Sequence, residues 1–208
     1  MIDVAHPRDL VMIGAIFGLA AFIWSGWAQE APPKGLVFRI VLAGLGVVGL
    51  ALAVPSILTA IGNWSEPSAF TSGTSAFTLY LIVFWVEVII GAVASFFLIR
   101  TSQTENIAPL ILAIVGVHFF ALAVVFGQPV LHLAGLLLTI VAVLAFVLPR
   151  DTAAPSFWCG ILGAPVFLGI GLWCLLAGYS ALTEHGALTA LVEHCALSGY
   201  SALTALAV

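Results

Sequence analysis

Six long apolar segments alternate along the chain with short polar stretches. Each segment has about the 20 mainly apolar residues that a helix needs to cross a lipid bilayer. The stretches between them contain prolines or groups of Gly, Ser and Thr, which end helices. Since lipid requires backbone polar groups to be satisfied within helices, the pattern predicts an all-α, polytopic transmembrane helix bundle. The six spanning helices are expected at about residues 10–28, 40–61, 77–99, 107–126, 130–148 and 157–177.

The composition supports a membrane location. Of the 208 residues, 63% are hydrophobic and only 7% are charged, whereas a soluble domain carries about 25% charged residues. We therefore expect an integral membrane protein whose main partner is the lipid bilayer. A net charge of −4 with five basic residues argues against nucleic-acid binding, which requires Lys and Arg against phosphates.

The basic residues predict an orientation. Loops 29–39, 100–106 and 149–156 face the same side, and the opposite side has Arg8 alone. The three loops hold the other four basic residues, which are Lys34, Arg39, Arg100 and Arg150. Cytoplasmic loops are enriched in Lys and Arg, so these loops are expected in the cytoplasm and both termini outside, in a bacterial cell membrane. The first apolar run is interpreted as a retained helix rather than a cleavable signal peptide.

Residues 179–208 differ in composition from the six-helix bundle expected over residues 1–178. They contain no Phe, Trp, Ile, Lys or Arg, and Tyr-Ser-Ala-Leu-Thr occurs twice, at 179–183 and 200–204. An extra membrane helix, an interfacial helix and a non-native tail all remain open. The metal-capable side chains of this segment match no ordinary zinc spacing, so no metal site is expected from Glu184, His185, Glu193, His194 and Cys195.

Glu87 is the one charged residue in the middle of an apolar run, and the other thirteen lie outside the runs or at their ends. A charged side chain at the bilayer centre costs roughly 3 kcal/mol on insertion scales. Burial disfavours the charged form of a carboxyl group, so Glu87 needs a partner, a proton or a cation. It is either a titratable binding site or a hydrogen-bonded acid that only fixes how the helices pack.

His118 is the candidate partner of Glu87. The two residues lie near the middle of the third and fourth segments, which run in opposite directions and are joined by a short loop. At 1.5 Å rise per residue, the two side chains should agree in depth to within about 2–3 Å. A Glu–His pair could share a proton. The alternative is a neutral histidine bonded to a backbone carbonyl, to Tyr80 or to a serine.

Three further residues complete the candidate proton- or ligand-binding site. Helical spacing places Tyr80, Phe84, Gly91 and Ser95 on the face of Glu87, and this face should point into the bundle. His132, three residues after a proline at the outer end of the fifth helix, could line an external vestibule. The chain has no G-x-S-x-G, Walker A, H-E-x-x-H or dinucleotide motif, so neither a catalytic residue nor a cofactor is predicted.

Gly116-Val-His-Phe-Phe-Ala-Leu-Ala123 resembles a G-x-H-F-x-x-L-A segment of uncharacterised multi-pass bacterial membrane proteins, a resemblance that implies no particular activity. The best functional hypothesis is a small transporter or a proton- or cation-coupled binding protein with a Glu–His site at the membrane midplane. The alternative is a non-transporting scaffold, sensor or assembly subunit, as a homo-oligomer or with a membrane partner, in which Glu87 is structural. An intramembrane enzyme acting on a lipid-soluble substrate is a third, weaker hypothesis.

Overall fold

The chain folds into helices joined by short loops. The structure, a computed structural model, describes the backbone of residues 2–206 and the side chains of residues 2–184. Within that part, six helices are long and apolar enough to cross a membrane, as the sequence predicted. The elements are α1 (Pro7–Trp27), α2 (Leu36–Gly62), α3 (Ser75–Arg100), the short 3₁₀ helix η1 (Thr104–Asn106), α4 (Ile107–Val125), α5 (Val130–Val147) and α6 (Pro155–Leu206).

Local sequence signals explain where several helices begin and end. Pro7 occupies the first turn of α1, where its missing N–H costs no hydrogen bond. The hydroxyl of Thr74 accepts a hydrogen bond of 3.2 Å from the backbone N–H of Phe77 and so caps α3. The turn between α4 and α5 contains Gly127 at φ +61°, a left-handed conformation that glycine adopts without strain.

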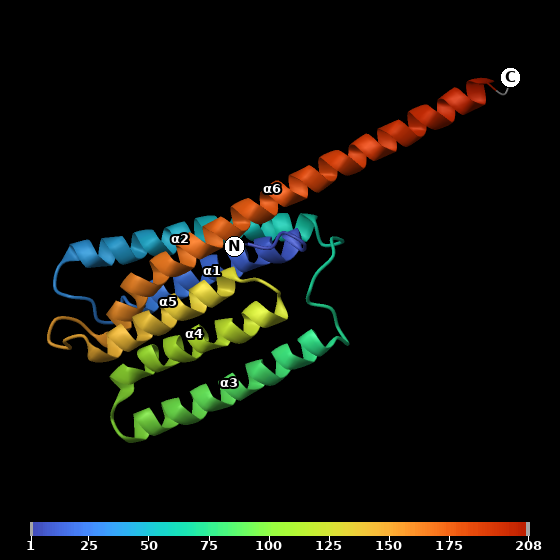
Figure 1. The fold of residues 1–208 in the computed structure, drawn as a ribbon. Helices are drawn as coiled ribbons and strands as arrows, with labels where there is room; N and C mark the ends of the chain where they lie inside the picture. The colour runs from blue at the N-terminus through green and yellow to red at the C-terminus, as the bar shows by residue number, and fades with distance from the viewer. Residues whose placement is uncertain (1, 207–208) are drawn as a thin grey trace.

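The helices form two closely packed groups that meet at α6. α1 makes its most extensive contacts with α6 and α2, while α4 packs mainly against α5, and α5 also packs on α6 (Figure 1). The buried centre includes three aromatic rings from different helices. Phe17 lies edge-on to Phe119 and Phe167, at centroid distances of 5.0 and 5.4 Å.

Glycines allow the closest helix approaches, as expected for membrane helices, where small residues let backbones come together. A Cβ atom added to Gly18 of α1 would lie 2.7 Å from the backbone oxygen of Gly49 in α2, and Gly116 and Gly135 make a similar approach between α4 and α5. Gly14 and Gly18 of the first helix therefore serve contacts within the chain. Gly44, in contrast, faces open space.

α3 lies at the edge of the bundle and packs mainly against α4. Within α3, all of which is described, Gly91 is the only buried residue. Large apolar side chains such as Trp85, Ile89 and Phe97 are each more than half exposed. An apolar face of this size is compatible with surrounding lipid, and α3 depends on α4 for its position.

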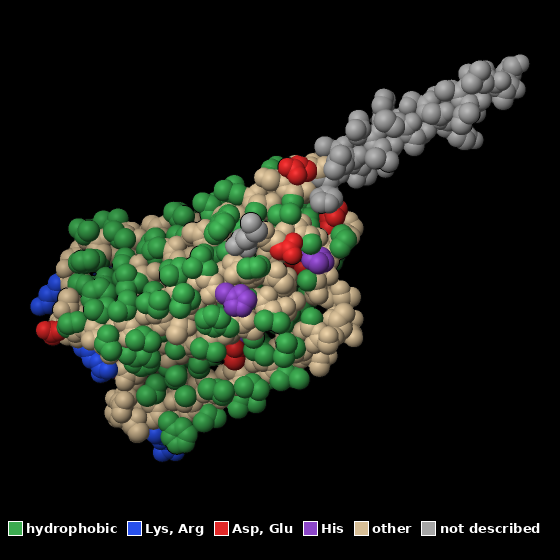
Figure 2. Space-filling view, viewed as in Figure 1, with side chains coloured by type: hydrophobic (Ala, Val, Ile, Leu, Met, Phe, Trp, Pro, Cys, Tyr) green, Lys and Arg blue, Asp and Glu red, His purple; other side chains and the backbone are tan. Residues whose placement is uncertain are grey.

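The loops divide between two ends of the bundle. The α1–α2, α3–α4 and α5–α6 loops lie at one end, and the α2–α3 and α4–α5 loops lie at the other end with the N-terminus (Figure 1). Figure 2 shows Lys and Arg side chains at the first end, hydrophobic side chains over the middle, and His and most of the visible Asp and Glu toward the second. The end with the three loops is called the basic end, and the opposite end is called the N-terminal end.

α6 does not end near residue 177, where the sixth span was expected to stop. The helix continues without a break to Leu206, because no proline follows Pro165 within it and the Ala- and Leu-rich sequence favours a helix. The part described with side chains is apolar enough to span a membrane over Pro155–Glu184. The side chains of His185, Glu193, His194 and Cys195 lie outside the described residues.

Candidate functional site

One face of α3 lies against α4 and carries the acid. Glu87, at position 13 of the 26 residues of α3, is half-buried on this face together with Tyr80, Val83 and Ser95. Phe84, which the sequence placed on the same face, is 40% exposed. Val83, four residues and so about one helical turn before Glu87, is less exposed and takes the inner position instead.

Glu87 contacts His118, a contact that the matched depth of the two residues allowed but did not by itself predict. Nδ1 of His118 lies 2.5 Å from Oε2 of Glu87, and the two side chains are only 16% and 21% exposed. His118 is residue 12 of the 19 in α4, so both groups lie near the middle of their helices. The Nδ1 atom makes no aligned hydrogen bond with any described residue, so the contact is a close approach of two ionisable groups rather than a well-directed hydrogen bond.

The surroundings of the pair are apolar. One turn along α3, a Cβ atom added to Gly91 would lie 3.5 Å from Ile111 and 3.7 Å from Ile114 of α4. The imidazole ring of His118 lies 6.0 Å from the ring of Phe119. With few polar neighbours, the interaction between the two ionisable groups is weakened less than it would be in water.

Tyr80 and Ser95 share the inner face of α3 but lie away from the pair. They are seven and eight residues from Glu87, which corresponds to about 10 and 12 Å along the helix axis. The ring of Tyr80 instead belongs to an aromatic cluster at the N-terminal end, where its centroid lies 4.8 Å from that of Phe70 and 6.2 Å from that of Phe84.

His132 is exposed at the start of α5, and the structure does not bring it to the pair. Its ring lies 6.0 Å from the ring of Phe120. Phe120 follows His118 by two residues, so the two side chains point about 200° apart around α4. His118 thus faces α3, while His132 packs beside the opposite face of α4.

Two cavities lie elsewhere. One of about 230 Å³ is at the basic end, and an apolar groove of about 240 Å³ lies between α2 and α6. Neither is lined by Glu87 or His118. Among the described residues, no three His, Cys, Asp or Glu side chains are grouped closely enough to hold a metal ion.

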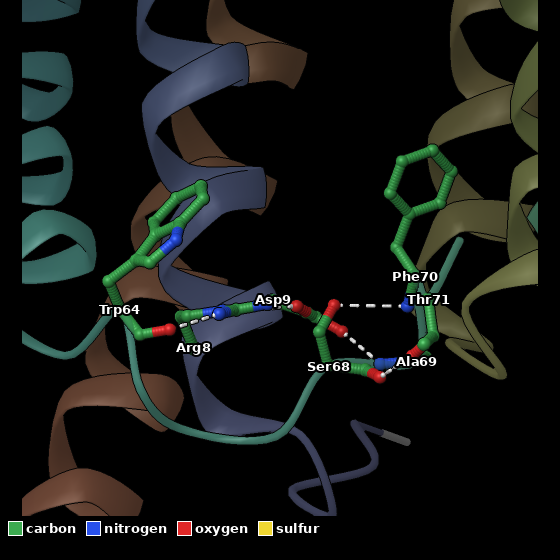
Figure 3. A network of polar contacts seen from close by, with 7 residues as sticks. All are labelled: Arg8, Asp9, Trp64, Ser68, Ala69, Phe70 and Thr71. Atoms are coloured by element: carbon green, nitrogen blue, oxygen red, sulfur yellow. Dashed lines mark hydrogen bonds and ion pairs between the residues drawn. The ribbon is translucent and has the colours of Figure 1, made fainter.

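A polar network at the N-terminal end was not predicted from the sequence (Figure 3). Asp9, only 5% exposed, accepts a hydrogen bond of 2.7 Å from the backbone N–H of Ala69. The neighbouring Arg8 donates to the backbone oxygen of Trp64 and stacks over its ring at 4.9 Å. Both residues of α1 therefore hold the α2–α3 loop.

Gln128 forms a second link at the same end. Its amide side chain, only 1% exposed, donates a 2.7 Å hydrogen bond to the backbone oxygen of Asp3 and accepts one of 3.2 Å from the N–H of that residue. The sequence feature that could have indicated the contacts of Arg8 and Asp9 is the position of this charged pair directly before the first apolar run. Which loop the pair would hold depends on tertiary packing.

In comparisons with protein-family models, with curated proteins and with solved structures, nothing matched the chain.

Proposed function

We propose that this integral membrane protein binds a proton or a small cation at Glu87 and His118, as a small transporter or as a proton- or cation-coupled binding protein. The proposal is carried by one observation, the 2.5 Å approach of two ionisable groups from adjacent helices near mid-membrane depth. Intramembrane acids are costly, and they commonly mark ion or proton pathways.

The chemistry follows from the number of protons on the pair. With one shared proton the pair is neutral overall, and adding or removing a proton leaves a net charge in an apolar seam. A cation could take the place of the added proton beside the carboxylate of Glu87. Since α3 packs mainly against α4, a change of charge at this contact would act directly on the packing of α3.

A scaffold or assembly role is the second candidate. Two observations favour it: neither cavity reaches the pair, and the broad apolar outer face of α3 could pack on another copy of the chain or on a membrane partner. In that case the contact between Glu87 and His118 would only fix the position of α3.

The two roles differ in what the variant Glu87→Gln does. The test measures proton flux into liposomes that contain the full-length protein and a trapped pH-sensitive dye, under an imposed potassium diffusion potential. A protein that moves protons gives dye acidification above that of empty liposomes, and Glu87→Gln and His118→Gln abolish this signal while retaining insertion. The matched control is His132→Gln, an exposed histidine away from the pair, which should keep the wild-type flux.

Flux that is unchanged in Glu87→Gln would refute a role of the pair in proton movement. For cation coupling, the same liposomes are assayed for sodium uptake with the same three variants. Absence of both fluxes in the wild-type protein, with all variants equally inserted, would favour the scaffold role.

We also infer that the basic end faces the cytoplasm and that both termini lie outside, in a multi-pass arrangement in a bacterial cell membrane. The support is that Lys34, Arg39, Arg100 and Arg150 lie in, or directly beside, the three loops at one end of the bundle, together with the positive-inside rule. Single cysteines placed at Lys34 and at Ser72, in a variant lacking the native cysteines, should react with an impermeant thiol reagent in intact cells only at position 72.

A further inference from the structure

A cavity at the basic end lies where three segments that are distant in sequence meet. The end of α1, the η1 turn and the beginning of α6 border an open cavity of about 230 Å³, room for a ligand of several non-hydrogen atoms. The walls combine one aromatic ring, two carboxyl groups and two hydroxyl groups. The residues that supply these groups are Trp27, Glu30, Glu105, Thr104 and Ser156.

The two carboxyl groups of the cavity differ in their partners. Glu105 is paired with Arg150, whose guanidinium group also donates a 3.0 Å hydrogen bond to Asn106. Glu30 takes part in none of the ion pairs found among the described residues. One Glu charge is thus balanced by Arg150, and the charge of Glu30 is not.

Helix ends do not cancel this charge. The N-terminal ends of α4 and α6 and the C-terminal end of α1 all reach the cavity. At about half an elementary charge each, their sum is about +0.5. The unit negative charge of Glu30, which is exposed at the mouth of the cavity, is larger than this sum, so these groups together favour a cation.

Ser156 points to a ligand independently of charge. The residue is only 5% exposed and lines the cavity. Its hydroxyl group has no hydrogen-bond partner in the part of the chain that the structure describes. A ligand with an N–H donor would give this hydroxyl oxygen a partner.

We propose that this cavity binds a primary ammonium group. An ammonium group has three N–H donors, which match the carboxylates of Glu30 and Glu105 and the hydroxyl oxygen of Ser156. Trp27 adds an aromatic face that attracts cations, and its ring is held by stacking on Trp24 at 5.3 Å. The ammonium group could belong to a small free amine or to the head group of an amine-bearing phospholipid, because the cavity lies at the end of the membrane-spanning helices.

The test uses the full-length protein in phosphatidylcholine nanodiscs, with ethanolamine as the probe and saturation-transfer NMR as the readout. We expect saturable binding, weakened at least tenfold in Glu30→Gln, which corresponds to about 1.4 kcal/mol. Ser156→Ala should weaken binding severalfold. Choline should bind more weakly than ethanolamine, because its quaternary nitrogen has no N–H to donate. The matched control is Asp151→Asn, an exposed acid at the same end that does not line the cavity.

A second arm separates the two sources of the ammonium group. Nanodiscs doped with phosphatidylethanolamine should suppress the ethanolamine signal, and the purified protein should retain that lipid, if the source is a lipid head group. An ethanolamine signal that is unaffected by the doped lipid identifies a free amine. The proposal is overturned if ethanolamine binds wild type and Glu30→Gln with equal affinity, or if choline binds as tightly as ethanolamine. It is also overturned if the protein shows neither saturable ethanolamine binding nor retention of phosphatidylethanolamine. Glu87→Gln should leave this binding unchanged, so the site is tested separately from the proposed proton site.

Discussion

The interaction between Glu87 and His118 should contribute more to the free energy of unfolding than an exposed ion pair in the same chain does. The perturbation is a double-mutant cycle with Glu87→Gln, His118→Gln and the double variant. Gln has nearly the volume of Glu and keeps a hydrogen-bonding group, so the cycle removes ionisable character with little change in packing.

The distance between the carboxyl group and the imidazole ring sets the expected size of the coupling energy. At 2.5 Å and an effective dielectric constant of about 20, two unit charges attract by about 7 kcal/mol. Removing each ion from water costs several kcal/mol and offsets most of this attraction. Double-mutant cycles between membrane helices average about 0.6 kcal/mol and reach about 1.7 kcal/mol. A pair this close and this little exposed should lie at the upper end, with a coupling of about 1–2 kcal/mol.

The assay is reversible unfolding of the purified protein in mixed micelles, followed by circular dichroism as the fraction of denaturing detergent rises. The matched control is the cycle Glu105→Gln with Arg150→Gln. That ion pair joins side chains that are 48% and 46% exposed, and exposed pairs contribute about 0–1 kcal/mol. Added salt should reduce the control coupling and leave the Glu87–His118 coupling nearly unchanged, because salt screens exposed charges more strongly.

A Glu87–His118 coupling no larger than the Glu105–Arg150 coupling would refute this reasoning. It would mean that the close approach of Nδ1 and Oε2 contributes nothing specific to the packing of α3 on α4. A strong salt dependence of the Glu87–His118 coupling would likewise show that water and ions reach the pair freely.

Three other substitutions test the packing of the helices by the same unfolding assay. Gly18→Ala should destabilise the fold by about 1–3 kcal/mol, because its Cβ would meet backbone atoms of α2 at 2.7 Å. Its control, Gly44→Ala, meets nothing within 4 Å and should be neutral or stabilise the fold by up to about 1 kcal/mol. Equal effects of the two substitutions would contradict the α1–α2 contact. Gly91→Ala should be tolerated, since its Cβ would meet only side-chain atoms at ordinary contact distance, and a loss above about 1 kcal/mol would count against the α3–α4 packing. Asp9→Ala should lower the free energy of unfolding by about 1–3 kcal/mol, because it leaves the N–H of Ala69 in the α2–α3 loop unpaired. The control is Asp151→Ala, which removes an exposed acid. Similar small losses in both variants would contradict a stabilising link between Asp9 and the loop.

The positions of the helices could be predicted because they depend on local properties of the chain. Apolar length and the polar breakers located the start of each of the six long helices and the end of the first five to within four residues, and helix rise gave the common depth of Glu87 and His118. The end of α6 was missed, since a change in composition near residue 178 does not by itself break a helix.

Properties that depend on how helices rotate and pack could not be predicted in the same way. Phe84 and Val83 are adjacent, so a modest rotation of α3 decides which of them faces α4. His132 is at the N-terminal end of the bundle, as its place after Pro129 suggested, but the side of α4 on which it lies is set by the position of α5. The link from Asp9 to the α2–α3 loop joins residues 60 positions apart, and no local pattern specifies that partner.

α3 is held by a small number of contacts, and this makes the Glu87–His118 pair well placed to influence it. The loop before α3 is tied to α1 through the hydrogen bond between Asp9 and Ala69. The middle of α3 is tied to α4 through the pair, and its remaining surface is largely exposed and apolar. A proton gained or lost at the pair would therefore act on a helix with few other contacts to resist the change. In a helix with more extensive packing, such as α1, the same change of charge would be opposed by contacts with α2 and α6.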